Sequence, residues 1–281
     1  TAEDIRDLLK DRGIGHALVV EEETTDLPPT PNNWAEAHAG LWADKWRAAK
    51  TKEEVGLESQ KTWEVVQNYK GRTIKSRWAF RVSRESDGSL KFRARLVAKG
   101  FSEVKGIDYF ATFSPTVSSK ALMILLHLAA TEDWEIRSLD VGNAYLESPL
   151  DVPLHMELPP EPGQPRRVVL LKKSLYGLKQ AGELWNRLLD SILKKLGFTR
   201  CHSDPCVYHR IDSRGKIFIA VYVDDLLVLL STLQLAKDFE EDFGKHVKKL
   251  TVKGDAEGYV GLEFKRSRAD RTITVTQTQY V

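Results

Sequence analysis

The sequence predicts an α+β fold, in which helices and strands are mixed without a repeating order. Several short stretches alternate polar and apolar residues with the two-residue period of a half-buried strand, as in KFRARLV at residues 91–97. Others, such as ALMILLHLAATED at residues 121–133, are long and apolar enough for a buried helix. Because no regular strand–helix–strand rhythm and no internal repeat connects them, a doubly wound parallel sheet is disfavoured.

The length and the charge distribution narrow the class of protein. The chain of 281 residues can form one large domain or two subdomains, since domains commonly span roughly 100–200 residues. Its 42 Lys and Arg residues nearly balance its 40 Asp and Glu residues, but residues 70–105 hold eleven basic and three acidic residues. Such a basic segment suits a polyanionic partner, and a solvated strand face is the alternative interpretation.

Cysteine content and hydropathy predict the compartment. Only Cys201 and Cys206 are present, and no charged-then-apolar signal segment opens the chain. These features predict an intracellular, reducing compartment. The apolar runs are shorter than the roughly 18–20 residues that a membrane-spanning helix needs, so we expect a soluble protein without a membrane partner.

The first predicted element is a linker over residues 1–33, which ends in the Pro- and Asn-rich stretch DLPPTPNN. A helix over residues 34–59 follows, with its tryptophans expected in the core. Three strands come next, and the sequence SDGS between the second and the third indicates a hairpin turn. These strands are predicted at residues 62–66, 74–84 and 90–101.

Alternation in the third of these strands separates its charged from its apolar side chains. Lys91, Arg93 and Arg95 fall on one face, and the apolar residues that alternate with them fall on the other. We therefore expect one face of the hairpin to pack on the core, and the other to be free to meet phosphates.

The second half of the chain continues the mixture of helices and strands. After the buried helix, residues 134–141 predict a strand that delivers Asp140 near its end. A strand from residue 166, a turn at Gly177 and a long helix ending at Gly197 come next. From Asp204 onward the pattern is mostly that of strands, with one helix over residues 235–245.

Residues 217–230 (IFIAVYVDDLLVLL) are apolar almost throughout, except for the adjacent Asp224 and Asp225. Two buried like charges are costly unless something compensates them. If they lie at a hairpin tip, the strand that ends at Asp140 can bring a third carboxylate to the same sheet. Three such groups can bind two divalent cations, and Mg²⁺ suits them because it prefers oxygen ligands from a few carboxylates and substrate phosphates. An ordinary polar turn is the alternative interpretation.

A series of short motifs resembles, in order and spacing, the reverse transcriptase of copia-type long-terminal-repeat retrotransposons. The motifs are TWEVV, SRWAFRV, RARLVAKGF, GIDYFATFSP, LDVGNAYL, KKSLYGLKQA, LGF and VYVDDLLVL. The resemblance covers residues 34–281 and implies a right-hand polymerase with fingers and a palm built on an antiparallel sheet. Residues 60–120 are then expected to be fingers-like and residues 121–281 mainly palm-like. The thumb and ribonuclease H, which follow in that family, are expected to be absent from this chain.

The resemblance also implies roles for individual residues. Asp140, Asp224 and Asp225 match the catalytic aspartates that bind two Mg²⁺ ions, with Mn²⁺ as a substitute. Tyr145, where the family more often has Phe, matches the aromatic residue that excludes the 2′-hydroxyl of a ribonucleotide. The further candidates for nucleotide binding are Gly177, Gln180, Lys75, Arg95 and Lys99. The candidates for binding the nucleic-acid strand are Arg72, Arg77, Arg93 and Lys179.

The function implied by the resemblance is RNA-directed DNA polymerisation, in which deoxynucleotides are added to a primer 3′ end by two-metal phosphoryl transfer. The expected partners are an RNA or DNA template with its primer, deoxynucleoside triphosphates and other segments of a retrotransposon polyprotein that serves DNA integration. The expected location is the cytoplasm, in virus-like particles, with nuclear entry left open.

Some features favour a different interpretation. Met123 and Glu183 stand where the family commonly carries basic residues, and the thumb and ribonuclease H are not expected. The alternative is a truncated or domesticated copy that binds nucleic acid or partner proteins without catalysis. A third interpretation is one part of a larger assembly whose other chains supply the missing domains.

Overall fold

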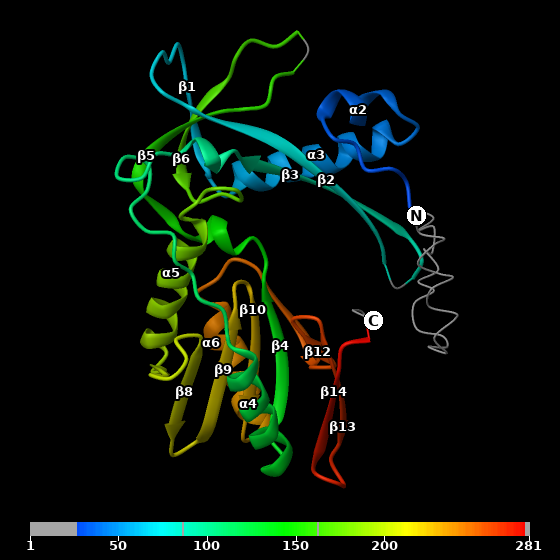
Figure 1. Ribbon diagram of the computed structural model, residues 1–281, viewed down its shortest axis with the longest axis vertical. Helices are drawn as coiled ribbons and strands as arrows, with labels where there is room; N and C mark the ends of the chain where they lie inside the picture. The colour runs from blue at the N-terminus through cyan, green and yellow to red at the C-terminus, as the bar shows by residue number, and fades with distance from the viewer. Residues whose placement is uncertain (1–26, 86, 162, 279–281) are drawn as a thin grey trace, which may run out of the picture.

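The computed structural model describes residues 27–85, 87–161 and 163–278 (Figure 1). Most of the predicted linker, residues 1–26, lies outside the described residues. The predicted mixture of helices and strands is confirmed: a five-stranded sheet and a six-stranded sheet lie one above the other along the long axis of the molecule, and a three-stranded sheet flanks the lower one. None of the helices within these residues is both long and apolar enough to cross a membrane.

The five-stranded sheet, called the upper sheet below, has the strand order β1-β6-β5-β2-β3. Helices α2 and α3 accompany it, and Trp46 of α3 packs edge-on against Phe80 and Phe92 with ring centroids 5.3 and 4.8 Å apart. These contacts bury the apolar face of the β2–β3 hairpin, as its alternation predicts. The bounds are α2 (Trp34–Ala39), α3 (Ala43–Ser59), β1 (Trp63–Val66), β2 (Ile74–Arg84), β3 (Leu90–Ala98), β5 (Pro149–Glu157) and β6 (Val168–Lys173).

One detail of the upper sheet differs from the predictions. The helix predicted over residues 34–59 is broken, because Gly40 leaves the helical conformation and takes extended backbone angles (φ −96°, ψ 172°). Glycine is among the weakest helix formers, so a break at this position is physically reasonable. The strands β5 and β6 join the upper sheet, although they follow β3 in the chain only after α4 (Ser119–Thr131) and β4 (Glu135–Val141).

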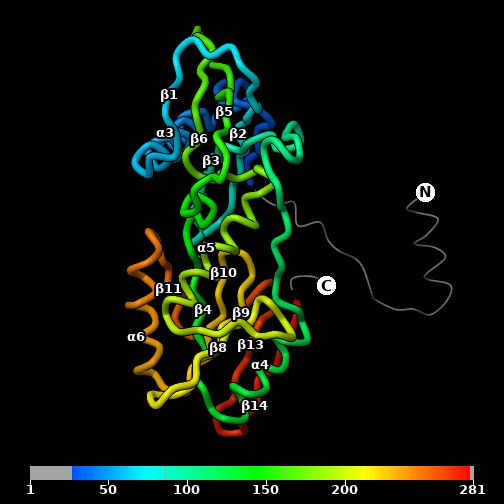
Figure 2. Tube along the Cα trace, turned by 90° about the vertical axis from the view of Figure 1, so that its left-hand side faces the viewer, coloured from blue at the N-terminus to red at the C-terminus, as the bar shows by residue number. Residues whose placement is uncertain are grey.

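The six-stranded sheet, called the lower sheet, is antiparallel throughout and has the order β11-β4-β10-β9-β8-β7. Helices α5 and α6 cover one face, while α4 and the three-stranded sheet cover the other (Figure 2). The strands are β4 (Glu135–Val141), β7 (Thr199–Arg200), β8 (Val207–Asp212), β9 (Gly215–Tyr222), β10 (Asp225–Leu230) and β11 (Leu250–Asp255). The other elements are α4 (Ser119–Thr131), α5 (Ala181–Lys195), α6 (Leu233–Gly244), β12 (Gly258–Tyr259), β13 (Leu262–Ser267) and β14 (Thr272–Thr276).

Burial on both faces explains why β10 is apolar along its length. Leu226 and Val228 pack toward α5 and α6, whereas Leu227 and Leu229 pack toward α4 and the three-stranded sheet. A strand covered on both faces has no solvent side that would require alternation. The only charged residue of β10 is therefore at its first position, Asp225.

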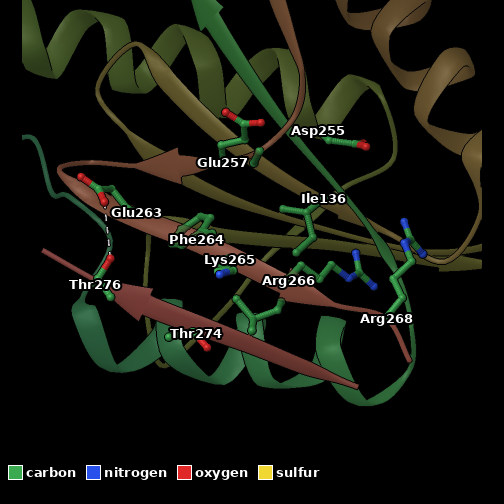
Figure 3. A pocket seen from close by; sticks show the side chains of 12 residues that line it. Ile136, Asp255, Glu257, Glu263, Phe264, Lys265, Arg266, Arg268, Thr274 and Thr276 are labelled. Atoms are coloured by element: carbon green, nitrogen blue, oxygen red, sulfur yellow. Dashed lines mark hydrogen bonds between the residues drawn. The ribbon is translucent and has the colours of Figure 1, made fainter. Parts of the chain in front are cut away.

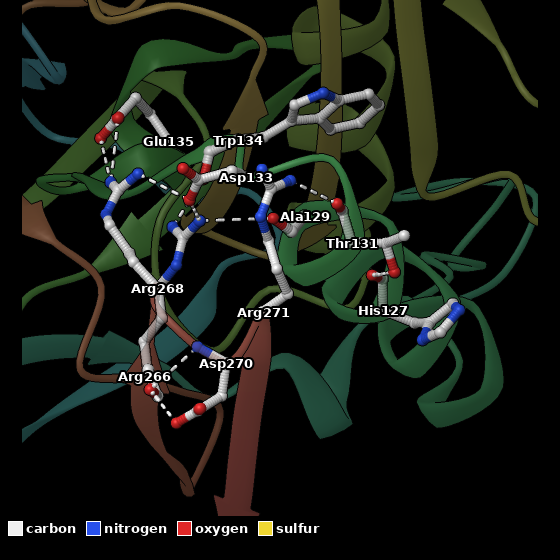
Figure 4. Close-up of polar contacts among 11 residues, drawn as sticks. His127, Ala129, Thr131, Asp133, Trp134, Glu135, Arg266, Arg268, Asp270 and Arg271 are labelled. Carbon is white, nitrogen blue, oxygen red and sulfur yellow. Dashed lines mark hydrogen bonds and ion pairs between the residues drawn. The ribbon is translucent and has the colours of Figure 1, made fainter.

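Three arginines tie the β13–β14 hairpin to the end of α4 and the start of β4 (Figure 4). Arg266 and Arg271 donate to backbone carbonyls in the last turn of α4, where helix carbonyls lack intrahelical partners. Arg266 and Arg268 also pair with Asp133 at 2.8 and 2.9 Å, and Arg268 contacts both carboxylate oxygens of Glu135. These contacts fix the three-stranded sheet against the lower sheet.

A pocket of about 810 Å³ lies beside this hairpin, between the start of β4 and the segment that follows β11 (Figure 3). Several of its charged groups already have protein partners, because Arg137 pairs with Asp255, and Thr276 donates to Glu263. The pocket therefore lies where the hairpin contacts the lower sheet. Asp140 lies near the opposite end of β4, which points toward the upper sheet.

Candidate active site

The three predicted carboxylates lie together at the end of the lower sheet that faces the upper sheet. Strands β4 and β10 are antiparallel neighbours, and their register places Asp140 directly opposite Asp225. Side chains of directly opposed residues share one face of a sheet, with Cβ atoms about 4.5–5.5 Å apart. Asp224 precedes Asp225 in the turn, and its carbonyl accepts a hydrogen bond from the Val141 backbone N–H at 2.9 Å.

The turn that carries the adjacent aspartates is short and strained. Tyr222 pairs with Asp225 in the β9–β10 ladder, so only Val223 and Asp224 form the loop. Val223 has φ +55°, a left-handed conformation that β-branched residues rarely adopt. The indole N–H of Trp185 on α5 donates to the Val223 carbonyl at 2.7 Å. Trp185 is buried in the core between α5 and the lower sheet, and the sequence gives no signal for this hydrogen bond.

Negative charge accumulates where the three carboxylates meet. Burial raises the pKa of Asp224, and the negative charges of Asp225 and Asp140 raise it further, while Arg95 opposes the shift. Asp225 pairs with Lys253 of β11 at 3.1 Å. Both partners are partly exposed, so this pair contributes at most about 1 kcal/mol.

The donor set fits divalent cations that arrive with phosphate ligands. Within residues 27–85, 87–161 and 163–278, no group of three or more His, Cys, Asp or Glu side chains forms a ready metal centre. Mg²⁺ does not require one, because it is usually bound by one or two carboxylates together with waters and substrate phosphates. Asp140 and Asp225 offer such ligands. Asp224 lies beside them, and their negative charges disfavour its ionised form unless a cation is present.

Tyr145 lies in the seam between the two sheets. It belongs to the 3-10 turn η2 (Ala144–Glu147), which follows Asn143 in a left-handed conformation (φ 60°). Its ring packs partly on the core of each sheet and meets the ring of Tyr176 edge-on, with centroids 4.8 Å apart. Burial raises the pKa of Tyr145, and the negative charge of Asp224 raises it further.

Gly177 brings the loop before α5 against the end of β3. Its φ of +91° favours glycine, and a Cβ atom at this position would lie 2.1 Å from the Ala98 carbonyl oxygen. The Tyr176 carbonyl accepts from the Ala98 N–H at 2.8 Å. The guanidinium of Arg95 lies over the Tyr176 ring, 4.6 Å from its centroid. Tyr176 is thus a further member of the site, and the motif that contains it gives no separate signal for it.

The exposed face of the β2–β3 hairpin concentrates the predicted basic residues. Lys75, Arg77, Arg93 and Arg95 are all exposed there. Arg81 and Arg93 stand directly opposite each other in the ladder, an arrangement that is destabilising without a compensating anion. Arg81, Arg93, Arg95, Tyr176 and Gly177 line part of a pocket of about 380 Å³. Lys99, just beyond β3, is partly buried.

Three other predicted residues make contacts within the protein. Arg72 pairs with Asp108 and donates to the Ser102 carbonyl. Lys179 donates to the Glu103 carbonyl, and the Gln180 amide donates to the Asp108 carbonyl. Arg72, Lys179 and the buried Gln180 therefore hold the segment 100–110 in place. Their predicted contacts with nucleotide or nucleic acid remain predictions.

Glu183, which stands where the family commonly carries a basic residue, is partly buried. Its carboxylate pairs with Arg187 one turn later on α5, at 3.4 Å, and only 22% of its side chain is exposed. Arg187 also pairs with Asp151, so its guanidinium is shared between two carboxylates. Met123, the other departure, lies on α4 and is 39% exposed.

Comparison with known proteins supports one family. A family model described as reverse transcriptase (RNA-dependent DNA polymerase) matches residues 60–281. The retrovirus-related Pol polyprotein from transposon TNT 1-94 of Nicotiana tabacum is 35% identical over 231 residues, which cover 80% of this chain and 17% of that protein. The corresponding polyprotein from transposon RE1 of Arabidopsis thaliana is 33% identical over 246 residues, or 85% of this chain and 16% of that protein.

A yeast relative extends the same similarity. The transposon Ty1-ER2 Gag-Pol polyprotein of Saccharomyces cerevisiae is 30% identical over 243 residues, which cover 80% of this chain and 13% of that protein. The chain therefore spans less than a fifth of the length of these relatives. The family match extends over most of the chain, and the protein belongs to the reverse transcriptase (RNA-dependent DNA polymerase) family found in copia-type retrotransposon polyproteins.

Proposed function

We propose that this chain is the fingers and palm portion of an RNA-directed DNA polymerase, which adds deoxynucleotides to a primer 3′ end. The observation that carries the proposal is the register that sets Asp140 opposite Asp225, with Asp224 beside them. The lower sheet would be the palm. The upper sheet, including β5 and β6, would form the fingers, with its basic face toward the nucleic acid.

The residues of the site divide the work of phosphoryl transfer. Asp140, Asp224 and Asp225 would hold two Mg²⁺ ions, which supply positive charge to activate the primer hydroxyl and to stabilise the leaving phosphate. Arg95 is a candidate for the triphosphate, because its charge acts on Asp224 and its guanidinium carbon lies 4.6 Å from the centroid of the Tyr176 ring. A guanidinium can donate two hydrogen bonds to phosphate oxygens.

The partners follow from the same proposal. An RNA or DNA template with its primer would lie along the basic face of β2 and β3, and the deoxynucleotide would enter beside Tyr145 and Gly177. Other segments of the polyprotein would work with this chain, since its relatives are several times longer. The proposed location is the cytoplasm, in virus-like particles.

A second candidate function is nucleic-acid binding without catalysis. The observation that favours it is the Lys253–Asp225 ion pair, because a lysine that neutralises this carboxylate competes with a cation for it. The two candidate functions differ in whether they need the Asp225 carboxylate. Catalysis requires it, whereas nucleic-acid binding alone does not.

The test is extension of oligo(dT) on a poly(A) template with Mg²⁺, comparing the wild type with Asp225→Asn. The polymerase proposal requires incorporation by the wild type and a loss of about a hundredfold or more in the variant, because a metal contributes several kcal/mol to the transition state. If neither protein incorporates above background, catalysis is rejected and the binding function is left; equal incorporation above background would reject Asp225 as a catalytic residue.

We also expect the basic face of the β2–β3 hairpin to bind nucleic acid with strong salt dependence. Each neutralised phosphate contributes a slope of about −0.7 to −0.9 in log K against log salt. Arg93→Glu should reduce the magnitude of this slope by the contribution of about one to two phosphate contacts. The loss can exceed one contact because the new carboxylate can also pair with the opposed Arg81. The slope is measured by fluorescence anisotropy of a labelled oligonucleotide over a KCl series.

Lys52→Glu is the matched control for this prediction. It makes the same charge reversal at an exposed position of α3, the helix that covers the opposite, apolar face of the hairpin. The control should change the slope little. If both reversals change it equally, net charge governs binding and the strand does not follow the β2–β3 face.

A further inference from the structure

The aspartate turn needs an external support because its first residue is strained. Val223 occupies the first loop position of a two-residue hairpin with φ +55°. Hairpins with a positive φ at this position usually place Gly, Asn or Asp there, because a β-branched side chain clashes with the backbone. The next residue is Asp224, so any relaxation of the Val223 backbone directly moves the Asp224 carboxylate.

Two hydrogen bonds hold this turn from neighbouring elements. On one side the Val141 N–H at the end of β4 donates to the Asp224 carbonyl at 2.9 Å. On the other side the Trp185 indole N–H donates to the Val223 carbonyl at 2.7 Å. The Val223 side chain packs on the same core in which Trp185 is buried.

Trp185 is a rigid donor. It lies on α5 with only 1% of its surface exposed and belongs to the core between α5 and the lower sheet. A close-packed core restricts its two side-chain torsions, so the indole N–H has one position relative to the turn. The direction of the Val223 carbonyl is therefore set by a helix that lies outside the β9–β10 hairpin.

We infer that Trp185 is a positioning residue for the candidate active site, one that keeps Asp224 and Asp225 in register with Asp140 through its hydrogen bond to Val223. This inference rests on the proposed function. Without the bond, the strained turn relaxes and the carboxylates lose the alignment that two cations require. A displacement of about 1 Å in such a site can lower a rate by as much as a hundredfold.

The test uses Trp185→Phe, which removes the N–H and keeps most of the apolar ring. Trp134→Phe is the matched control, because Trp134 is also buried against the lower sheet, stacked on Phe218, but on the other face. Three quantities are measured: Mn²⁺ affinity by water-proton relaxation, the single-turnover extension rate, and the urea midpoint of unfolding.

We expect Trp185→Phe to weaken Mn²⁺ binding and to slow extension by about ten- to a hundredfold, with the primer–template Kd changed less than about twofold. Trp185→Phe and Trp134→Phe should lower the urea midpoint by similar amounts, but Trp134→Phe should leave the Mn²⁺ affinity unchanged. A further variant, Val223→Gly, removes the strain. Added to Trp185→Phe, it should restore most of the rate and the Mn²⁺ affinity.

The opposite results overturn the inference. If Trp185→Phe lowers only the urea midpoint, or if Val223→Gly does not rescue it, Trp185 is an ordinary core residue. Failure of the proposed function is distinguished separately, because the wild type would then extend primers no better than Asp225→Asn. In that case the Mn²⁺ affinities of the Trp185 and Trp134 variants still decide whether Trp185 positions the carboxylates.

Discussion

Asp224→Asn is expected to abolish primer extension while leaving the metal-free protein at least as stable as the wild type. The substitution removes a proposed cation ligand and no core contact, so the extension rate should fall by about a hundredfold or more. Asp140→Asn should have the same effect on extension, because Asp140 stands opposite Asp225 in the sheet. Extension is measured with saturating primer–template and Mg²⁺.

The stability half of this prediction follows from the sign of the pKa shift. The pKa of Asp224 is raised in the folded protein, chiefly by burial and then by Asp225 and Asp140. A raised carboxyl pKa favours folding below the unfolded-state pKa, and this contribution is lost as the pH rises through the folded-state pKa. In the absence of metal, Asp224→Asn should therefore gain stability relative to the wild type as the pH rises from acid to neutral.

Asp212→Asn is the control, because the pKa shift of Asp212 has the opposite sign to that of Asp224. Asp212 lies at the other hairpin of β9, and hydrogen bonds from Arg214 lower its pKa to about 2. Its contribution to stability is present above the unfolded-state pKa and is lost as the pH falls toward 2. This variant should lose a little stability at neutral pH and extend primers normally.

Urea unfolding across this pH range, in EDTA, distinguishes the two aspartates. The ligand assignment fails if Asp224→Asn unfolds at much lower urea than the wild type while its extension rate survives. Such a result would make Asp224 a structural residue of the turn.

Much of the fold was predictable because local pattern and local structure coincide in it. The alternation of β3 predicts which face is basic, and the apolar run of residues 217–230 predicts a hairpin with its aspartates at the tip. The position of Asp140 near a strand end was also correct. What joins these local predictions into a site is the pairing of β4 with β10, and register between strands far apart in sequence is not written in either strand alone.

The features that the sequence did not predict depend on contacts between distant segments. The hydrogen bond from Trp185 to Val223 spans 38 residues, and the pairing of Arg72 with Asp108 spans 36. A buried tryptophan is commonly interpreted as a core residue, and an arginine in a basic run is commonly interpreted as a phosphate ligand. Only the tertiary structure shows that the first donates a hydrogen bond to a turn with a positive φ and that the second pairs with the carboxylate of Asp108.

Tyr145→Val is expected to reduce the preference for deoxynucleotides over ribonucleotides by an order of magnitude or more, while deoxynucleotide addition persists. The ring of Tyr145 packs against Tyr176 and partly on the cores of both sheets, and the charge of Asp224 raises its pKa. We therefore expect a sugar held beside the carboxylates to meet this ring. A ring packed against the 2′ carbon rejects a hydroxyl by overlap. Such rejection can exceed the roughly 1–3 kcal/mol that a methylene-sized difference contributes in a merely close-fitting pocket.

Tyr145→Phe separates the ring from its hydroxyl and is the matched control. If bulk alone excludes the ribonucleotide, Phe should preserve the preference and only Val should lose it. The measurement is the ratio of incorporation efficiencies for a deoxynucleotide and the matching ribonucleotide on one template. Tyr145 also packs partly on the cores of both sheets, so a purely structural role is the competing explanation. A structural role would lower both efficiencies together in Tyr145→Val and leave their ratio unchanged, which would reject Tyr145 as the residue that selects the sugar.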